Sequence, residues 1–249
     1  MAWPFPPTWK SAPAQFSIGE NDVHLWLAAV PDCMPDLPRL RALLNTEERE
    51  RADRFHFQRD RDRYVMGRGV LRELLAGYLG TSEFAFALNK FGKPSLQPPH
   101  EELQFNVSHS RDLALFGFTR ARDIGVDVEW IRPDFATLEI AERFFAPDEA
   151  NLLGEYSETE RPLAFFNCWT RKEAYIKARG IGLSLGLSTF SVTLKPGEPP
   201  ALVRVGNDSE APNRWTLLDF DVGAEYRAAA AFEGRECAIS CYRWGRNPS

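Results

Sequence analysis

The order of apolar and polar residues predicts two successive groups of helices and strands. In the first group, residues 45–48 (N-T-E-E) are typical of a helix start, and leucines with helical spacing follow them. Apolar and β-branched runs indicate strands at residues 23–29, 105–107 and 113–119. A short polar segment, residues 120–123, then links the two groups.

The second group repeats helices and strands in a related order. A strand is predicted at residues 124–129, helices at 138–145 and 148–153, and a longer helix at 161–178 that stops at Gly180. Four further strands, expected to be antiparallel, are predicted at residues 189–194, 215–221, 227–232 and 236–244. This pattern favours an α+β fold and is compatible with a duplication, although no repeat is visible in the sequence.

Composition narrows the class of protein. The chain has 249 residues, of which 44% are hydrophobic and 26% charged, as in an average globular protein. We expect no membrane partner, because no apolar run reaches the ~18–20 residues of a membrane span. A net charge of -5 disfavours binding of nucleic acid over the whole surface. Four cysteines are too few for a disulfide scaffold, so a cytoplasmic protein with reduced thiols is expected.

Two acidic residues form the first candidate site, in the segment G-V-D-V-E. On a strand, Asp127 and Glu129 would share one face, ~6.5 Å apart, while the valines point the other way. Two neighbouring carboxylates are costly to bury unless a cation lies between them, and Mg²⁺ prefers such oxygen ligands. The alternative is a strand whose polar face is in water.

A second candidate lies on the long helix, where Trp169, Glu173 and Lys177 share one face. The glutamate and lysine could be an ordinary surface pair worth ~0.2–0.5 kcal/mol. The tryptophan on the same face favours a partly buried stripe instead.

Three further segments could bind an anion or lie on the surface. Ser108 and His109, in F-N-V-S-H-S, are predicted in a polar turn whose hydroxyls and amides could donate to phosphate. Lys93 and Pro94, in F-G-K-P, would hold one cation on a rigid turn. The arginine-rich residues 49–72 are interleaved with acids, which is typical of a solvated helix face, although some arginines could bind phosphate.

The order of these motifs carries more information than any one of them. The chain runs R-x-x-x-G-R-x-x-x-R, F-G-K-P, F-N-V-S-H-S, G-V-D-V-E, F-F-A-P-D-E and W-T-R-K-E-A-Y-I-K-A-R-G-I-G-L. Over about residues 49–194 it resembles the 4'-phosphopantetheinyl transferases of the surfactin-synthetase-activating (Sfp-like) type. The G-V-D-V-E and W-x-x-K-E-A-x-x-K pair is the most specific part of the resemblance.

This resemblance implies a reaction and a fold. The family transfers the phosphopantetheine arm of coenzyme A to a serine of an acyl or peptidyl carrier domain and releases adenosine 3',5'-bisphosphate. The expected fold has two similar α+β halves in a pseudo-twofold arrangement, each with a mainly antiparallel sheet packed against helices. The halves would be residues 1–122, which contact the nucleotide, and 123–249, which hold the metal site and catalytic helix. A monomer is expected.

The resemblance also assigns roles to residues. Asp127, Glu129 and Glu173 would bind Mg²⁺ or Mn²⁺. Glu173, Lys177, Asp127 and His109 would be catalytic, and whether Glu173 acts as base or only as metal ligand stays open. The expected coenzyme A contacts are Arg51, Arg63, Lys93, Pro94, Ser108, His109, Lys172 and Lys177.

Two other functions share part of this pattern. A metal-dependent hydrolase of a nucleotide pyrophosphate would use the same carboxylates with water as nucleophile. A non-catalytic protein that binds coenzyme A or a carrier would not need the full set of carboxylates and Lys177.

Overall fold

The structure, a computed structural model, describes residues 8–245. Its helices are α1 (Val30–Cys33), α2 (Leu37–Leu43), α3 (Thr46–Asp53), α4 (Gln58–Leu79), α5 (Leu138–Phe144), α6 (Pro147–Gly154), α7 (Arg161–Arg179) and α8 (Ala211–Arg214). Its strands are β1 (Trp9–Ser11), β2 (Asp22–Ala29), β3 (Phe86–Leu88), β4 (Pro94–Leu96), β5 (Leu103–Ser110), β6 (Leu113–Arg120), β7 (Ile124–Trp130), β8 (Phe190–Val192), β9 (Leu202–Val205), β10 (Trp215–Phe220), β11 (Tyr226–Glu233) and β12 (Ala238–Arg243).

The two halves share one topology, which confirms the predicted fold of two similar α+β halves. The N-terminal half runs β2, α4, β5, β6, and its strands lie in the order β2-β6-β5. The C-terminal half runs β7, α7, β10, β11, and its strands lie in the order β7-β11-β10. In each half the first strand therefore pairs with the last, and a long helix follows the first strand.

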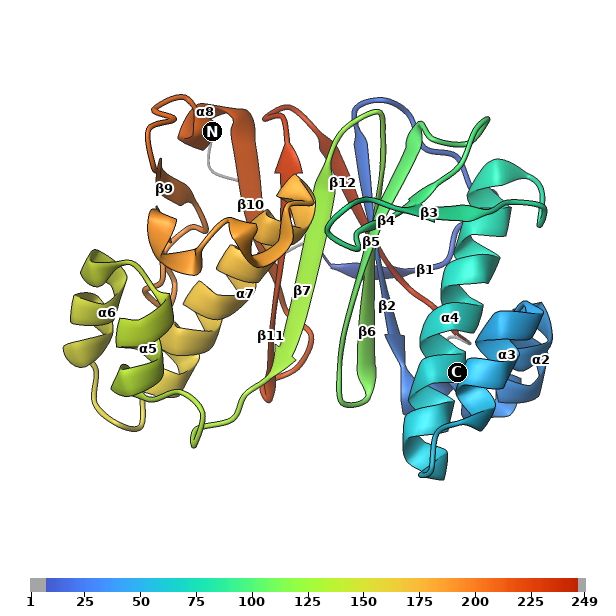
Figure 1. The fold of residues 1–249 in the computed structure, drawn as a ribbon, viewed down its shortest axis with the longest axis horizontal. Coiled ribbons are helices and arrows are strands. Elements are labelled where there is room, and N and C mark those ends of the chain that lie inside the picture. The colour runs from blue at the N-terminus through green and yellow to red at the C-terminus, as the bar shows by residue number, and fades with distance from the viewer. Residues whose placement is uncertain (1–7, 246–249) are drawn as a thin grey trace.

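The halves pack as four layers, with α4 and α7 outside and the two sheets between them (Figure 1). Alternation along the strands builds the three cores between these layers. On β2, Leu25 and Leu27 face the second sheet, whereas Trp26 packs toward α4. On β7, Val126 and Val128 face the first sheet. The opposite face of β7 is left for α7 and for the acidic residues.

Local sequence signals explain where the helices begin and end. The side chain of Asn45 accepts from the N–H of Glu48, and the carboxylate of Glu48 accepts from the N–H of Asn45, which forms a capping box at the start of α3. The helices α4 and α7 end at Gly80 and Gly180, which have φ of 69° and 61°. Glycine adopts this left-handed conformation without steric cost. The predicted bounds of α5, α6 and α7 are correct to within one residue, whereas the helical stretch expected after residue 45 divides into α3 and α4.

Two predictions about strands are corrected by the structure. The last strand, β12, pairs in parallel with β2 and thus belongs to the sheet of the N-terminal half, so residues 238–243 return across the predicted boundary. The strand β5 extends through Ser110, and only Arg111 and Asp112 form the turn before β6. Polar residues on one face of β5 resemble a turn in the sequence, but they meet partners on β7.

No helix in residues 8–245 is both long enough and apolar enough to cross a membrane.

Candidate active site

The close packing of α7 on β7 forms the frame of the site. Gly125 lies where a Cβ atom would be 2.1 Å from the carbonyl oxygen of Ala174 and 2.2 Å from the amide nitrogen of Ala178. Only glycine allows the helix backbone to approach the strand this closely. This approach brings the predicted face of α7, with Glu173 and Lys177, against the acidic end of β7.

Three of the sequence motifs meet in a hydrogen-bonded triangle. The ammonium group of Lys177 donates to Oδ1 of Asp127 at 2.6 Å and to Oγ of Ser108 at 2.9 Å. The hydroxyl of Ser108 in turn donates to Oδ1 of Asp127 at 2.9 Å. The triangle joins α7 and β7 of one half to β5 of the other, so F-N-V-S-H-S, G-V-D-V-E and W-x-x-K-E-A-x-x-K contribute to one place.

The other two carboxylates lie in the electrostatic field of this triangle. Burial and the charge of Asp127 raise the pKa of Glu173 to about 7, although Lys177 acts in the opposite direction. Burial and Asp127 also raise the pKa of Glu129, and Ser110, which donates to its Oε2 at 2.9 Å, acts against this rise. Three ionised acids would exceed the single positive charge of Lys177, and this repulsion adds to burial in favouring the neutral form of Glu173 and Glu129.

The carboxylates suit a divalent cation in their chemistry. Asp127 is 3% exposed, and its Oδ2 atom is buried without a hydrogen-bond partner. An uncommitted carboxylate oxygen beside two further acids is the donor set that Mg²⁺ prefers. Within the described chain, however, no group of three or more His, Cys, Asp or Glu side chains is arranged to hold a metal as it stands. The donors are therefore present near one another without forming a finished coordination shell.

The N-terminal half contributes charged residues around the β5–β6 turn. His109 is exposed, and the alternation of β5 places it on the opposite face from Ser108. The guanidinium of Arg63 donates to Oδ1 of Asp112, within the turn, at 2.8 Å. Arg51 is exposed and stacks over the ring of Tyr64, with 5.5 Å between its Cζ and the ring centroid. The structure thus does not bring Arg51, Arg63 and His109 into contact with the triangle.

Lys93 links the β3–β4 hairpin to the other half. Its ammonium group donates to the carbonyl oxygen of Ala178 at 2.8 Å, at the end of α7, and to that of Ile124 at 3.3 Å. Burial lowers its pKa, against the effect of Asp123. Pro94, half-buried, is the first residue of β4. In this state the charge of Lys93 is engaged with a helix C-terminus, where a cation is favoured.

Lys172 is buried in the core of the C-terminal half, away from the site where a contact with coenzyme A was expected. Its side chain is 0% exposed, and its ammonium group pairs with Oε2 of Glu149 at 2.6 Å and donates to the carbonyl oxygen of Leu187 at 2.7 Å. A wholly buried, fully engaged cation does not reach a phosphate. This burial argues against the predicted contact with coenzyme A and assigns Lys172 to the core beneath α7.

Sequence reasoning missed Ser110 and Asn106. Both lie on the face of β5 that also carries Ser108, and they accept hydrogen bonds from the backbone of β7. The signal was present in F-N-V-S-H-S, where polar residues occupy every second position, as on one face of a strand.

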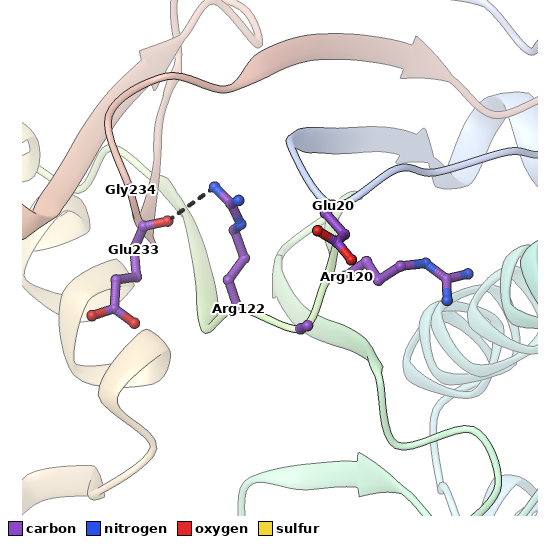
Figure 2. A pocket seen from close by; sticks show the side chains of 6 residues that line it. Glu20, Arg120, Arg122, Glu233 and Gly234 are labelled. Carbon is purple, nitrogen blue, oxygen red and sulfur yellow. Dashed lines mark hydrogen bonds between the residues drawn. The ribbon is translucent and has the colours of Figure 1, made fainter.

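A shallow, open depression of the described surface lies away from this site. It has a volume of about 310 Å³ and is lined by residues of the segment linking the halves, including Arg120 and Arg122, and by Glu20, Glu233 and Gly234. Figure 2 shows Arg122 directed toward the carbonyl group of Glu233. None of the predicted site residues lines it, and its open shape and mixed charges give no reason to place the chemistry there.

Comparisons with known proteins identify the family. A family model described as the 4'-phosphopantetheinyl transferase superfamily matches residues 123–231, and one described as 4'-phosphopantetheinyl transferase, N-terminal, matches residues 33–117. The chain is 37% identical to the 4'-phosphopantetheinyl transferase HetI of a Nostoc species, over 91% of this chain and 94% of that protein.

A second sequence relative agrees with this match. The identity to the 4'-phosphopantetheinyl transferase Sfp of Bacillus subtilis is 34%, over 78% of this chain and 84% of that protein. A solved structure of a holo-(acyl-carrier-protein) synthase from Bacillus anthracis, in complex with CoA (3',5'-ADP), is 21% identical over 47% of this chain and 96% of that chain, with a TM-score of 0.35. By its sequence relatives and family models, the chain belongs to the 4'-phosphopantetheinyl transferase superfamily.

Proposed function

We propose that the chain transfers the 4'-phosphopantetheine arm of coenzyme A to a serine hydroxyl of an acyl or peptidyl carrier domain and releases adenosine 3',5'-bisphosphate. The observation that carries this proposal is the triangle of Asp127, Lys177 and Ser108, which unites three motifs from both halves. Family membership supports the reaction type.

In this reaction the serine oxygen attacks the β-phosphorus of coenzyme A. A new phosphorus–oxygen bond forms, and the bond from the β-phosphorus to the oxygen bridging it to the α-phosphorus breaks. The α-phosphate leaves with the adenosine as the bisphosphate. Catalysis of such a step depends on positioning the reactants and on neutralising charge.

The residues of the triangle suit this task. Lys177 is 28% exposed and so presents its ammonium group both to Asp127 and to the surface, where it could meet phosphate oxygens. We propose that Asp127, Glu129 and Glu173 hold Mg²⁺, for which Mn²⁺ could substitute. The chemistry that this cation supplies when bound is neutralisation of charge on the pyrophosphate oxygens.

The serine must lose its proton as it attacks. Glu173 lies one helical turn before Lys177 on the face of α7 turned to β7, and we propose that its carboxylate accepts this proton or holds a water that does. His109, exposed at the end of β5, would donate to the pyrophosphate. Arg51, Arg63, Lys93, Pro94 and Ser108 would contribute to the nucleotide end of coenzyme A.

Intact mass spectrometry tests the reaction. An apo carrier domain incubated with the protein, coenzyme A and Mg²⁺ should gain the mass of one phosphopantetheine, with adenosine 3',5'-bisphosphate as the other product. A carrier whose acceptor serine is replaced by alanine should gain nothing, and EDTA should stop the transfer. Free phosphopantetheine without a carrier adduct would instead show a hydrolase, and binding of coenzyme A without any product would show a non-catalytic protein.

A further inference from the structure

The outer edge of β7 is paired by side chains instead of by another strand. Its backbone N–H groups at Val126, Val128 and Trp130 donate to Oδ1 of Asn106 at 2.9 Å, to Oγ of Ser108 at 3.3 Å and to Oγ of Ser110 at 3.0 Å. We call these three bonds the β5–β7 seam. The seam satisfies an edge that would otherwise present free donors, and it fixes the register between the halves.

Ser110 has a second contact that ties the seam to the site. Its hydroxyl accepts from the N–H of Trp130 and donates its only proton to Oε2 of Glu129 at 2.9 Å. One side chain of the N-terminal half thus binds two consecutive residues of the C-terminal half, the carboxylate of Glu129 and the backbone N–H of Trp130. The contact restricts the rotation of Glu129 and commits one of its two oxygens.

The position of Ser110 is itself well determined. The next residue, Arg111, has a φ of 50°, and its guanidinium carbon lies 3.0 Å from the ring centroid of Trp130. Asp112 then receives Arg63 on its side chain, and its carbonyl oxygen accepts from the N–H of Val30 at 2.8 Å. The turn is therefore held both by β7 and by the body of its own half, so Ser110 has little freedom to move away from Glu129.

We propose that Ser110 is a positioning residue that orients the Glu129 carboxylate for the divalent cation. The proposal rests on the proposed function, in which Glu129 is a metal ligand. Groups that hydrogen-bond to a ligating carboxylate orient it, and their loss typically weakens metal affinity or activity by ~10–100-fold. It follows that the metal site of the C-terminal half is completed by a hydroxyl of the N-terminal half.

The test compares Ser110→Ala with Ser110→Thr and with Asn106→Ala. The threonine keeps the hydroxyl, whereas Asn106→Ala removes a seam bond of the same kind at Val126, farther from Glu129. Binding of Mg²⁺ to each full-length protein in the presence of coenzyme A is measured by calorimetry. The melting temperature and the dependence of kcat on Mg²⁺ concentration are measured for the same proteins.

We expect Ser110→Ala to weaken Mg²⁺ binding by about tenfold or more, with kcat recovering at high Mg²⁺. Ser110→Thr should bind Mg²⁺ nearly as the wild type does. Asn106→Ala should lower the melting temperature at least as much as Ser110→Ala and leave Mg²⁺ affinity unchanged.

Two results would overturn the inference while leaving the proposed function intact. One is wild-type Mg²⁺ affinity in Ser110→Ala, and the other is an equal loss of affinity in Asn106→Ala, which would reduce Ser110 to a part of the seam. A wild-type protein that transfers phosphopantetheine without binding Mg²⁺ would remove the metal site and this inference with it.

Discussion

Lys177 on α7 and Asp127 on β7 form an ion pair with 2.6 Å between Nζ and Oδ1, where the helix packs closely against the strand at Gly125.

 The two residues are 50 positions apart in the chain, and the close approach of α7 to β7 brings them together. Asp127 is nearly fully buried, whereas Lys177 remains partly exposed. The ion pair therefore extends from the interior of the C-terminal half to its surface, where the ammonium group of Lys177 also contacts Ser108 of the other half.

The first prediction concerns this cation. Lys177→Met should lower kcat/KM for carrier modification by ~100-fold, because it removes a positive charge that the proposed reaction uses and leaves the carboxylates uncompensated. Lys177→Arg, which keeps the charge with a different shape, should retain part of the activity. Steady-state rates of carrier modification check both variants. A kcat/KM of Lys177→Met equal to that of the wild type would exclude Lys177 from the mechanism.

The second prediction concerns the packing of α7 on β7. Gly125→Ala should lower the free energy of unfolding by ~3 kcal/mol or more, because the new methyl group would meet the helix backbone, which cannot move aside as a flexible side chain can. Gly67→Ala is the matched control, since Gly67 lies inside α4 with nothing within 4 Å of an added Cβ.

The control should instead raise the free energy of unfolding by ~0.5–1 kcal/mol. Urea unfolding of both variants measures these changes. Equal stability of the two variants would show that close contact at Gly125 is not what limits the approach of α7.

The third prediction separates a structural lysine from a ligand-binding one. Lys172→Met should lower the free energy of unfolding by ~3–5 kcal/mol, because it leaves the buried carboxylate of Glu149 without its partner. The double variant Lys172→Met, Glu149→Gln should recover part of that loss. The folded fraction should keep the wild-type KM for coenzyme A. A raised KM together with unchanged stability would restore the role that the sequence suggests for Lys172.

The fourth prediction concerns acid stability of the N-terminal half. Burial alone would raise the pKa of Glu48, but hydrogen bonds from Arg72 and Arg68 outweigh it and hold this pKa below its ordinary value. The folded-state pKa is thus lower than the unfolded value of about 4.3. The stabilisation is complete above that unfolded value and is lost as pH falls through the folded one.

A comparison of the wild type with Glu48→Gln tests this sign. The difference in free energy of unfolding between them should be largest near neutral pH and should shrink as the pH is lowered below about 4.3. A difference that stays constant with pH would show that the ionised form of Glu48 is not what Arg68 and Arg72 stabilise.

The sequence predicts the elements well where a local signal marks them. Helical spacing with a capping residue located α3, α4 and α7, and alternation located β2 and β7. The partner of a strand is not a local property, so the parallel pairing of β12 with β2 could not be derived from either segment. It depends on the cores that the two sheets form together.

The candidate site shows the same limit. The shared face of Glu173 and Lys177 follows from helical geometry, and that of Asp127 and Glu129 follows from strand alternation. The burial of Lys172 and Lys93 could not be predicted, because the sequence around each lysine does not distinguish it from an exposed one. Their engagement with Glu149 and with the end of α7 arises from tertiary packing.

The most direct test of a metal and coenzyme A site at the junction of the two halves is a crystal structure of the protein soaked with coenzyme A and Mn²⁺. Mn²⁺ scatters anomalously and accepts the same carboxylate ligands as Mg²⁺. We predict an anomalous peak from a Mn²⁺ ion bound by Asp127 and Glu129. The pyrophosphate of coenzyme A should contact the same ion, with Lys177 beside it. Coenzyme A bound elsewhere on the protein, with no peak at these carboxylates, would contradict the assignment.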